Sequence, residues 1–536
     1  MKVFPLSCAD FYKVGHIFQY PKGTTKVYSN MTPRMSRNTY TNEVVFFGLQ
    51  YFMREYLVRN WNDEFFFKPK AKVIRKYKRR LDYALGADSV TVNHIEALHD
   101  LGYLPIKIKA VYEGAVVPMR TPVLTVVNTH PDFFWLTNYI ETLLSCMIWK
   151  PCTSATTAFH YRKEFERHMQ KTGGPKDFVK WQGHDFSFRG MSGLEDACLS
   201  GSAHLLSFTG TDTIPAIDFL EEYYNADANT ELIAGSVPAT EHAVMCVGMK
   251  DNEIETFERL ICEVYPNGVV SIVSDTWDFW QVMTEYLPLL KDKILARNGR
   301  LVIRPDSGDP VHIVAGYRIS ERPDDDTNAE VLLKDGKYFL LEKVYVSGEW
   351  KWKIGQELSE AEAIGAYAYM WKIFGGTISN TGYKILDSHI GLIYGDSITL
   401  DRQRNILSRL EEAGFSASNL VLGIGSFTYE YVTRDVYGFA MKATYAEVNG
   451  ESREIFKDPK TDSGMKKSAR GLIRVNEDFS YTDQVSWSEE STGMLKTVFE
   501  NGKIVKEFSL SEIRAKIDSH FQNIAYDSNG TMIVNS

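Results

Sequence analysis

Cysteine is scarce in this sequence, and its spacing argues against the common metal and disulfide patterns. There are six cysteines, with no CxxC pair among them and none in the second half of the chain. They are Cys8, Cys146, Cys152, Cys198, Cys246 and Cys262. Such scattered residues are typical of reduced, mostly buried thiols rather than of a disulfide framework or a zinc site. We therefore expect the protein in a reducing compartment, the cytosol.

Long apolar runs are also missing. The first residues, Met1–Leu6, form a stretch that is too short and too soon polar for a signal peptide. The most apolar candidate for a membrane span, 133–149, is interrupted by Asn138 and Glu141. That pattern predicts an amphipathic helix of the core, so we expect no membrane association.

An excess of positive charge is absent as well. The chain has 60 Lys and Arg against 69 Asp and Glu, a net charge of −9. This balance argues against a nucleic-acid coat or a binder of anionic membranes, but it leaves room for a local basic pocket. Hydrophobic residues make up 44% of the chain and charged residues 24%, as in globular proteins. Because 536 residues exceed one ordinary core, we expect two or three domains.

The sequence at both ends of the chain consists of short strand-like segments and turns. Residues 62–100 are rich in Lys, Arg and Asp and are typical of surface helices. Strand-like runs, with β-branched residues and nearby Pro or Gly, occur at 26–29, 43–47, 106–111 and 123–127. We predict that 1–150 and 436–536 together form a discontinuous α+β domain with an antiparallel sheet.

The middle of the chain, 151–435, has a different sequence pattern. Short apolar runs end in clusters of Gly, Ser, Asp or His, and helix-period segments such as 402–412 lie between them. The apolar runs are 269–273, 301–303, 390–394 and 419–422. This alternation predicts an α/β domain with a parallel sheet. The region 311–360, with a charged turn and a Tyr/Trp-rich strand pair, reads as an insertion.

Two Gly-containing loops follow the last two predicted strands. They are Gly395-Asp396-Ser397 and Gly423-Ile424-Gly425-Ser426. In α/β barrels the last two βα loops often hold a phosphate, because Gly lets backbone N–H groups approach the oxygens. A short GxGS is equally compatible with an ordinary tight turn, but two such loops in consecutive units favour phosphate binding.

Four cations lie in or just after such strand ends. They are Arg189, Arg304, Arg434 and Lys442. A single Arg is more often a surface charge or a structural salt bridge. Near Gly loops the set suits a substrate with several phosphates, since Arg can bind phosphate through two parallel hydrogen bonds.

One histidine and three carboxylates also follow predicted strands. His242, with Glu241 beside it, could be a base, an acid or a phosphoryl acceptor, although a lone His is more often structural. Asp212, Asp275 and Asp306 could be helix N-caps. Their functional alternative is hydrogen bonding to an amide or a ribose, or holding Mg²⁺ through water.

Two aromatic residues stand out beside polar clusters. Phe186 lies in His184-Asp185-Phe186-Ser187-Phe188-Arg189, and Tyr12 lies in Asp10-Phe11-Tyr12-Lys13. Aromatic residues make up 13% of the chain, and most of them must be core. A flat heteroaromatic ligand, however, is naturally held between two aromatic faces.

An ordered series of motifs resembles the nicotinamide phosphoribosyltransferase family. The resemblance covers nearly the whole chain apart from 311–360, where this sequence is longer. The motifs are Asp10-Phe11-Tyr12-Lys13-Val14-Gly15-His16, His184-Asp185-Phe186-Ser187-Phe188-Arg189-Gly190, Phe208-Thr209-Gly210-Thr211-Asp212-Thr213, Ser236-Val237-Pro238-Ala239-Thr240-Glu241-His242, Ile303-Arg304-Pro305-Asp306-Ser307-Gly308 and Val432-Thr433-Arg434-Asp435.

The resemblance implies a fold and a reaction. The fold is that of type II phosphoribosyltransferases: an irregular α/β barrel plus an α+β sheet domain built from both chain ends. The reaction transfers phosphoribosyl from 5-phosphoribosyl 1-pyrophosphate to nicotinamide, giving nicotinamide mononucleotide and pyrophosphate in NAD salvage. The resemblance also implies a homodimer with shared active sites, Mg²⁺, and ATP hydrolysis coupled through a phosphorylated His242.

It further implies how the two substrates are held. Phe186 would stack on one face of nicotinamide and Tyr12 of the partner subunit on the other. Asp212 would accept from the carboxamide and disfavour nicotinate, whose carboxylate it repels. Arg189, His242 and Arg304 would contact the pyrophosphate side.

The remaining residues implied by the resemblance serve the ribose, the phosphates and catalysis. Asp306, Gly395 and Asp396 would hold the ribose, and His242, Asp306 and Glu241 would be catalytic, Glu241 by orienting the His242 ring. Asp275 would lie near Mg²⁺–pyrophosphate. The phosphate and further substrate contacts would be Ser271, Gly425, Ser426, Arg434, Lys442 and Lys466.

Three other readings stay open from sequence alone. A nicotinate phosphoribosyltransferase on the same scaffold is disfavoured by Asp212. A non-catalytic nucleotide-binding or signalling relative is disfavoured by the retained His242, Arg304, Asp306 and Arg434. A phosphate-binding isomerase or aldolase is a third possibility, but no Lys for a Schiff base is clearly placed at a strand end.

Overall fold

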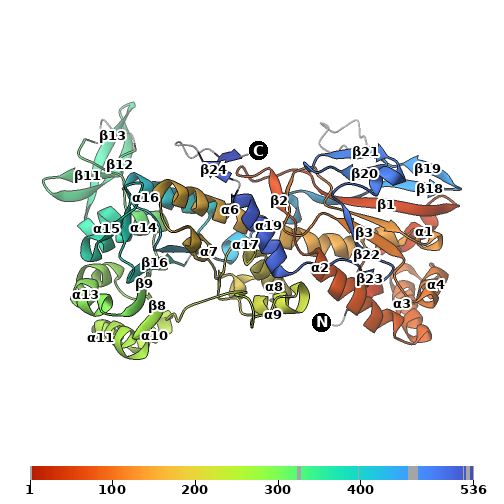
Figure 1. Ribbon diagram of the computed structural model, residues 1–536, viewed down its shortest axis with the longest axis horizontal. Helices are drawn as coiled ribbons and strands as arrows, with labels where there is room; N and C mark the ends of the chain where they lie inside the picture. The colour runs from red at the N-terminus through yellow and green to blue at the C-terminus, as the bar shows by residue number, and fades with distance from the viewer. Residues whose placement is uncertain are drawn as a thin grey trace.

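The computed structural model is elongated, with a parallel sheet towards one end and an antiparallel sheet at the other (Figure 1). The long helix α6 (Glu141–Thr172) and the late helix α19 (Leu510–Gln522) lie between the two sheets. The residues that the structure describes are 3–322, 328–395, 397–456, 469–522, 524–526 and 532–534.

The parallel sheet has six strands in the order β7-β6-β17-β16-β9-β8, and every neighbouring pair is parallel. Its strands are β6 (Gly183–Asp185), β7 (Gly210–Thr211), β8 (Asn267–Val273), β9 (Asn298–Arg304), β16 (Ile390–Tyr394) and β17 (Leu420–Ile424). The four apolar runs of the sequence correspond to β8, β9, β16 and β17. Buried Leu, Ile and Val dominate β16 and β9, as expected for strands covered on both faces.

The segment 235–240 joins the two outer strands of this sheet. Gly235 forms a parallel bridge with Gly210 of β7, and Ala239 forms one with Ser271 of β8. The Thr240 amide donates to the Ser271 carbonyl at 3.0 Å, which extends the contact with β8. The ring of strands is therefore closed by an irregular piece of chain, and the architecture is the predicted irregular α/β barrel.

Helices cover the outside of the barrel. The helix α16 (Leu400–Glu412) shows why they form where they do: the Thr399 side chain accepts from the Arg402 amide at its start, and Ile406, Leu407 and Leu410 are buried. The helices of this region are α7 (Val179–Gln182), α8 (Leu194–His204), α9 (Pro215–Tyr224), α10 (His242–Val247), α11 (Glu253–Arg259), α12 (Phe279–Gln281), α13 (Leu287–Leu295), α14 (Pro310–Ala315), α15 (Glu360–Phe374), α16 (Leu400–Glu412) and α17 (Ser426–Tyr429).

The antiparallel sheet takes strands from both chain ends, in the order β19-β18-β1-β5-β3-β22-β23. Its strands are β1 (Thr24–Pro33), β3 (Ile106–Ala110), β5 (Leu124–Asn128), β18 (Phe439–Val448), β19 (Glu451–Glu454), β22 (Lys496–Glu500) and β23 (Lys503–Ile504). β1 pairs with β18 from Thr24↔Val448 to Pro33↔Phe439. The other helices and strands from the two chain ends are α1 (His16–Gln19), β2 (Glu43–Val45), α2 (Leu49–Tyr51), α3 (Lys70–Leu85), α4 (Asn93–Leu101), β4 (Val116–Pro118), α5 (Leu136–Tyr139), β20 (Leu472–Val475), β21 (Tyr481–Val485), α18 (Trp487–Glu490), β24 (Ile524–Tyr526) and β25 (Met532–Val534). Of these, β24 lies near α6, in the middle of the molecule (Figure 1).

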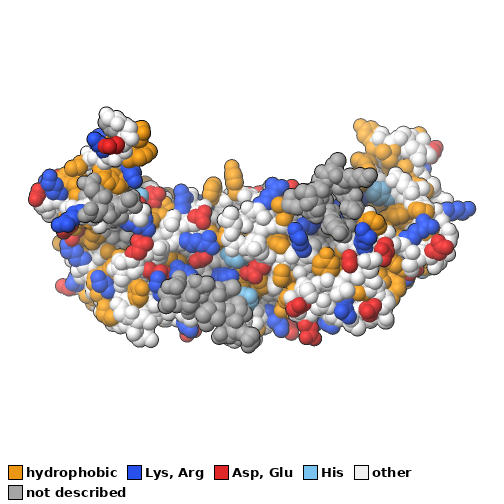
Figure 2. Space-filling model, turned by 90° about the horizontal axis from the view of Figure 1, so that it is seen from above, with side chains coloured by type: hydrophobic (Ala, Val, Ile, Leu, Met, Phe, Trp, Pro, Cys, Tyr) orange, Lys and Arg blue, Asp and Glu red, His pale blue; other side chains and the backbone are white. Residues whose placement is uncertain are grey.

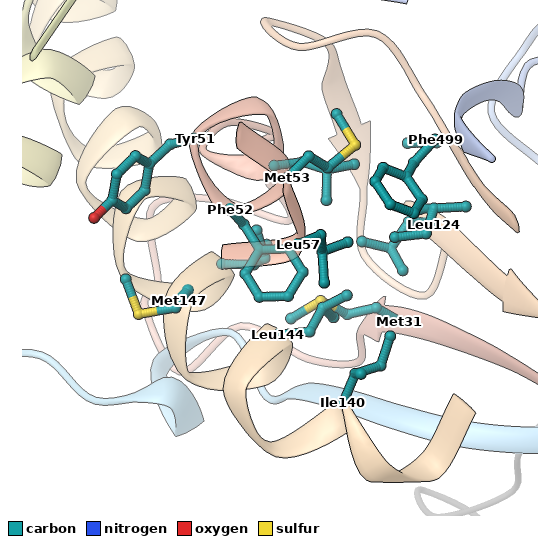
Figure 3. Packing of buried hydrophobic residues seen from close by; sticks show 14 of the residues in the cluster. Met31, Tyr51, Phe52, Met53, Leu57, Leu124, Ile140, Leu144, Met147 and Phe499 are labelled. Atoms are coloured by element: carbon teal, nitrogen blue, oxygen red, sulfur yellow. The ribbon is translucent and has the colours of Figure 1, made fainter. Parts of the chain in front are cut away.

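The core beneath this sheet mixes residues from distant parts of the chain. Met31, Leu124 and Phe499, from three strands, gather around Phe52 and the α6 residue Leu144 (Figure 3). The same cluster also takes in buried residues of α8 and α9, among them Ala203 and Leu220, which the sequence assigns to the barrel region. The boundary between the two hydrophobic cores therefore does not lie at residue 150. The helix α6 spans that position, and α8 and α9 pack into the core beneath the antiparallel sheet.

Most of the predicted insertion 311–360 belongs to a small separate sheet at the far end of the barrel (Figure 1), although its first residues, 311–315, lie in the barrel helix α14. Its strands are β10 (Ile319–Ser320), β11 (Val331–Lys334), β12 (Lys337–Val346) and β13 (Glu349–Leu358). The Tyr/Trp-rich strand pair of the sequence is the β12–β13 hairpin. A second small hairpin follows α15 and consists of β14 (Gly376–Ile378) and β15 (Lys384–Leu386).

No described helix is both long and apolar enough to span a membrane. On the face seen in Figure 2, acidic and basic side chains are interspersed among apolar and uncharged ones, and the coloured side chains form no broad patch of one sign.

A partly buried cluster of charges connects α16 to the long helix α6. Glu411 accepts from Arg167 Nη2 at 3.0 Å, His168 Nδ1 at 2.9 Å and Lys171 Nζ at 2.7 Å. Burial alone would raise the pKa of Glu411, but hydrogen bonds from His168 and Lys171 outweigh burial and lower the pKa to about 2. The contribution of Glu411 to stability is therefore present above pH 4.5 and lost as the pH falls towards 2.

We expect Glu411→Gln to lower the free energy of unfolding at pH 7 by about 1–2 kcal/mol, because α6 loses the charge that its three donors bind. The difference from the unchanged protein should shrink as the pH falls from 4.5 to 3. Urea unfolding followed by tryptophan fluorescence measures it. Glu412→Gln, at a half-exposed position next in sequence, is the control. A difference that stays constant with pH would contradict this linkage.

Candidate functional site

A cavity of about 370 Å³ opens at the carboxyl ends of the central barrel strands. Eight of the residues that the sequence predicts to bind substrate line it, from β6, β7, β9, β16 and β17 or the loops that follow them. The lining consists of Phe186, Arg189, Asp212, Arg304, Asp306, Gly395, Ser397, Gly425, Ser426 and Phe427. We call this cavity the strand-end pocket.

One side of the strand-end pocket presents a carboxylate next to an aromatic ring. His184 Nε2 lies 2.9 Å from Asp212 Oδ1, and the Ser236 hydroxyl donates to the same oxygen at 2.8 Å. Burial would raise the pKa of Asp212, but the hydrogen bonds from His184 and Ser236 hold it below its usual value. The ring of Phe186 lies 4.6 Å from that of His184, centroid to centroid. An ionised acceptor therefore stands beside a surface suited to a flat ring.

The fully buried carboxylate of Asp185 connects the two loops on this side of the pocket. Asp185 Oδ1 accepts from the Ser187 amide at 2.9 Å, and Oδ2 accepts from Thr211 Oγ1 at 3.1 Å and Thr213 Oγ1 at 2.7 Å. These contacts join the loop that carries Phe186 to the loop that carries Asp212. The distance between ring and carboxylate is thus fixed by the β6–β7 pair.

The pocket also has a cationic side, formed by Arg304 and Arg189. Arg304 Nη2 donates to the Thr240 carbonyl at 2.8 Å, and Arg304 Nε lies 3.6 Å from Asp306 Oδ2. Arg304 Nε is buried and makes no hydrogen bond. Arg189 is exposed at the rim. This arrangement keeps guanidinium donors available for an anionic ligand.

His242 lies at the edge of this cationic side and is half-exposed. Its Nδ1 lies 3.2 Å from Thr276 Oγ1, and its Nε2 lies 3.8 Å from Asp275 Oδ1 and 4.0 Å from Asp306 Oδ2. Glu241 is the N-cap residue of α10, and its carbonyl accepts from the amides of Val244 and Met245. Among the described contacts, no hydrogen bond or ion pair joins its side chain to His242, so its role in orienting that ring stays a prediction.

Of the two carboxylate oxygens of Asp275, one accepts hydrogen bonds from the loop that follows β9 and the other accepts none. Its Oδ2 accepts from the Asp306 amide at 2.9 Å and from Ser307 Oγ at 2.6 Å. Its Oδ1 is buried and accepts no hydrogen bond. Within the described ranges, no group of three or more His, Cys, Asp or Glu side chains is arranged to hold a metal ion.

The two Gly-containing loops meet above the barrel. A Cβ at Gly423 would stand 2.7 Å from Phe186 Cδ2 and 2.9 Å from the Gly395 Cα, so only glycine allows this approach. Gly425 precedes α17, and Ser426 is its first residue. Ser426 also approaches Gly190 closely, because a Cβ at Gly190 would stand 2.0 Å from Ser426 Oγ. The loops therefore pack against the loop that carries Phe186.

Three predicted substrate residues lie elsewhere, in a second cavity of about 460 Å³. Tyr12, Arg434 and Lys442 line it together, and the Tyr12 side chain is 64% exposed. The rest of its lining is Asp10, Lys13, Arg34, Glu141, Thr142, Ser145, Cys146, Trp149, Ala440 and Met441. We call it the N-terminal pocket. Within one chain, Arg434 and Lys442 thus do not line the pocket that holds Ser426.

One further predicted residue, Ser271, lines neither cavity. Ser271 is buried in β8, and its hydroxyl makes no hydrogen bond. Asp396 and Lys466 fall outside the described residues. Conversely, Ser397 and Phe427 line the strand-end pocket without having been predicted. The sequence signal for both was their position, because Ser397 belongs to the first Gly-containing loop and Phe427 directly follows the second.

Comparisons with known proteins agree with this geometry. Residues 181–503 match the model of the nicotinate phosphoribosyltransferase (NAPRTase) family, and residues 5–108 match the nicotinamide phosphoribosyltransferase N-terminal domain. The chain is 50% identical to the nicotinamide phosphoribosyltransferase of Acinetobacter baylyi, over 98% of this chain and 99% of that one. It is 31% identical to the nicotinamide phosphoribosyltransferase of Xanthomonas campestris, over 95% of this chain and 97% of that one.

The fold has a counterpart among solved structures. The nicotinate-nucleotide pyrophosphorylase from Pyrococcus furiosus superposes with a TM-score of 0.54 at 13% identity, over 97% of this chain and 96% of that one. At that identity the likeness concerns the fold alone. With a family model that covers more than half of the chain and a full-length relative at 50% identity, the chain belongs to the nicotinate phosphoribosyltransferase family.

Proposed function

We propose that this protein transfers the phosphoribosyl group of 5-phosphoribosyl 1-pyrophosphate to nicotinamide, giving nicotinamide mononucleotide and pyrophosphate. The observation that carries the proposal is Asp212, an ionised acceptor beside Phe186. Such a carboxylate can accept from the carboxamide N–H₂ and repels the carboxylate of nicotinate. The names of the full-length relatives and the matching N-terminal domain support the same base.

The pocket has the parts that this displacement needs. The pyridine nitrogen attacks the anomeric carbon, the bond from that carbon to the pyrophosphate oxygen breaks, and the electron pair leaves with pyrophosphate. Arg304 and Arg189 would stabilise the charge on the leaving group, while Asp306 would hold the ribose and offset the oxocarbenium-like charge. Gly425 and Ser426 would bind the 5′-phosphate.

We propose that Mg²⁺ arrives with the pyrophosphate rather than binding the protein first. Asp275 Oδ1, which is buried and accepts no hydrogen bond, is suited to such an ion, and the described residues offer no complete ligand set. The bound ion would neutralise charge on the leaving group. We also propose ATP as a coupled co-substrate that phosphorylates His242, which is half-exposed and held by Thr276.

We propose a homodimer in which the N-terminal pocket of one chain completes the strand-end pocket of the other. Exposed aromatic residues at both places support it, with Tyr12 64%, Phe427 53% and Tyr431 83% exposed. Tyr12, Arg434 and Lys442 of the partner subunit would then supply the second aromatic face and further phosphate contacts. We place the dimer in the cytosol, since six unpaired cysteines suit a reducing compartment.

A product assay tests the reaction. Purified protein is incubated with 5-phosphoribosyl 1-pyrophosphate, Mg²⁺ and either nicotinamide or nicotinate, with and without ATP, and the mononucleotide is quantified. We expect nicotinamide mononucleotide at low nicotinamide and little product from nicotinate. Turnover of nicotinate alone would favour the activity after which the matching family model is named. No product from either base would favour a non-catalytic relative.

Asp212→Ser tests the basis of the preference. We expect the ratio of kcat/KM for nicotinamide to that for nicotinate to fall by about 10²-fold, because the acceptor and the repulsive charge disappear together. Asp218→Ser, in the neighbouring helix α9, is the matched control and should keep the ratio. An unchanged ratio in Asp212→Ser would remove Asp212 from this role.

A further inference from the structure

The helix α3 concentrates positive charge on one side. It lies on the outside of the molecule, at the end that contains the antiparallel sheet (Figure 1). The side that packs into the core consists of Val73, Ile74, Tyr77 and Leu81. Because residues three and four apart share one side of a helix, the side turned away from the core is equally well defined. It carries Lys72, Arg75, Lys76, Arg79, Arg80 and Tyr83, which we call the basic stripe.

The five cations of the basic stripe have no carboxylate partner among the described ion pairs. The pairs that α3 forms there involve only Lys70 and Lys78, which lie beside the stripe. Their partners are Asp82, Asp88 and Asp100. The charge of the stripe is therefore available to a ligand, whereas the charges next to it are already compensated.

The N-terminal segment holds two of these cations in place. Lys76 Nζ lies 4.4 Å and the guanidinium carbon of Arg80 lies 5.1 Å from the centre of the Phe4 ring. The Arg80 guanidinium also donates to the Ser7 hydroxyl. Side chains that are already ordered lose less conformational freedom when they bind a ligand. The stripe is therefore partly organised for binding.

The stripe is a local excess of positive charge in a chain whose net charge is −9. At physiological salt, exposed charges more than about 8 Å apart are largely screened from each other. The attraction of an anion to the stripe is therefore decided by the five cations and not by distant acidic residues. From Lys72 to Arg80 the helix rises about 12 Å, the length of roughly three to four nucleotides of one strand.

Tyr83 distinguishes among the polyanions that fit such a stripe. Its side chain is 93% exposed, and it lies one turn beyond Arg79 on the same side of the helix. Arginines bind phosphates and an exposed ring stacks on flat bases, so the combination suits a ligand that has both. An anionic membrane fits less well, because the apolar side of α3 that would enter it is buried in the core.

We infer that the basic stripe binds single-stranded nucleic acid, with its cations on consecutive phosphates and Tyr83 stacked on a base. No residue of the stripe lines the strand-end pocket or the N-terminal pocket, so the inference does not depend on the proposed reaction. Stacking and phosphate contacts are common to all bases, and the binding therefore has little sequence preference. It weakens as salt rises, because binding releases the counterions of the phosphates.

The test is the fluorescence anisotropy of a labelled single-stranded RNA of about 12 nucleotides, titrated with the full-length protein between about 50 and 200 mM salt. We expect the logarithm of the association constant to fall linearly with the logarithm of the salt concentration. The expected slope is about −2 to −3.5, which is about 0.7 for each of three to five phosphates. No binding at the lowest salt concentration overturns the inference.

Arg75→Ala together with Arg79→Ala removes two central cations of the stripe. We expect this double variant to bind the RNA about 10–30-fold more weakly and to reduce the magnitude of the slope by about 1.4. The matched control is Arg259→Ala with Arg453→Ala, two exposed arginines outside α3. Unchanged urea unfolding verifies that each variant is folded. Equal losses in the two double variants contradict a role for the stripe.

Tyr83→Ala separates nucleic acid from other polyanions. We expect it to weaken RNA binding by about tenfold, because one base loses its stacking partner. Its affinity for inorganic polyphosphate, which has the charge but no bases, should not change. Tyr345→Ala, at a tyrosine that is 62% exposed in the β12–β13 hairpin, is the control. Unchanged RNA binding in Tyr83→Ala, or tighter binding to phosphatidylserine vesicles than to RNA, overturns the inference.

Discussion

Replacing Arg304 with alanine is expected to lower kcat/KM for nicotinamide mononucleotide formation by about 10²–10³-fold, the usual loss when one preorganised donor to a developing negative charge is removed. Arg304 is positioned for this task by its hydrogen bond to the Thr240 carbonyl, which aims the guanidinium across the pocket. Initial rates at varied concentrations of both substrates measure the effect. We expect most of the loss in kcat, because the charge on the leaving group is largest in the transition state.

The same strand provides the matched control for this prediction. Arg300 lies four residues earlier in β9, and its guanidinium donates to the Ser388 carbonyl and lies over Phe178 instead of lining the pocket. Arg300→Ala should therefore keep kcat/KM within a few-fold of the unchanged protein. Arg304→Lys keeps the charge without the planar pair of donors, and we expect it to recover only part of the activity. Equal losses in Arg300→Ala and Arg304→Ala would attribute the effect to the fold.

The largest effect on stability is expected at Glu113, far from the pocket. This carboxylate is 3% exposed and accepts from the Gln50 amide at 2.6 Å, the Gly48 amide at 3.0 Å and the Tyr224 hydroxyl at 3.0 Å. Glu113→Ala leaves three buried donors without an acceptor, so we expect the free energy of unfolding to fall by about 3–5 kcal/mol. Urea unfolding measures the change.

Tyr224→Phe tests the same group of hydrogen bonds with a milder change, because it removes one donor and keeps the acceptor. Alone it should cost about 1 kcal/mol, and in the Glu113→Ala background it should cost less, since the hydroxyl there has already lost its partner. Additive effects in the double variant would mean that the two groups do not act on each other. A loss below 1 kcal/mol in Glu113→Ala would show that water replaces the carboxylate.

Four of the six strands of the barrel could be predicted from sequence, because each is an apolar run that ends at a polar cluster, whereas β6 and β7 are short and contain no such run. The run 390–394 has the same bounds as β16, and the run 301–303 is the buried centre of β9. The closing segment 235–240 could not be predicted in this way. It contains Pro238 and has no apolar alternation, and its pairing depends on two strands that the chain reaches from different directions.

The site could be predicted in part, and for a similar reason. Parallel strands bring their carboxyl ends to one edge, so Asp212, Arg304 and Ser426 meet although they are distant in sequence. Arg434 and Lys442 follow the last strand but lie in the N-terminal pocket, because β18 carries the chain away to the other sheet. The hydrogen bond from His184 to Asp212 was missed, because 28 residues separate them and only the β6–β7 register makes them neighbours.

The pairing of β1 with β18 has a consequence for biosynthesis. The two strands are joined by roughly 400 residues of intervening chain, and a ribosome adding 5–20 residues per second needs roughly 20–80 s to make them. During that time the edge of β1 that faces β18 has no partner, and unpaired edges of this kind invite pairing with other chains. The antiparallel sheet is therefore the part of this protein most dependent on protection by chaperones while it is being made, and slower translation should increase its aggregation.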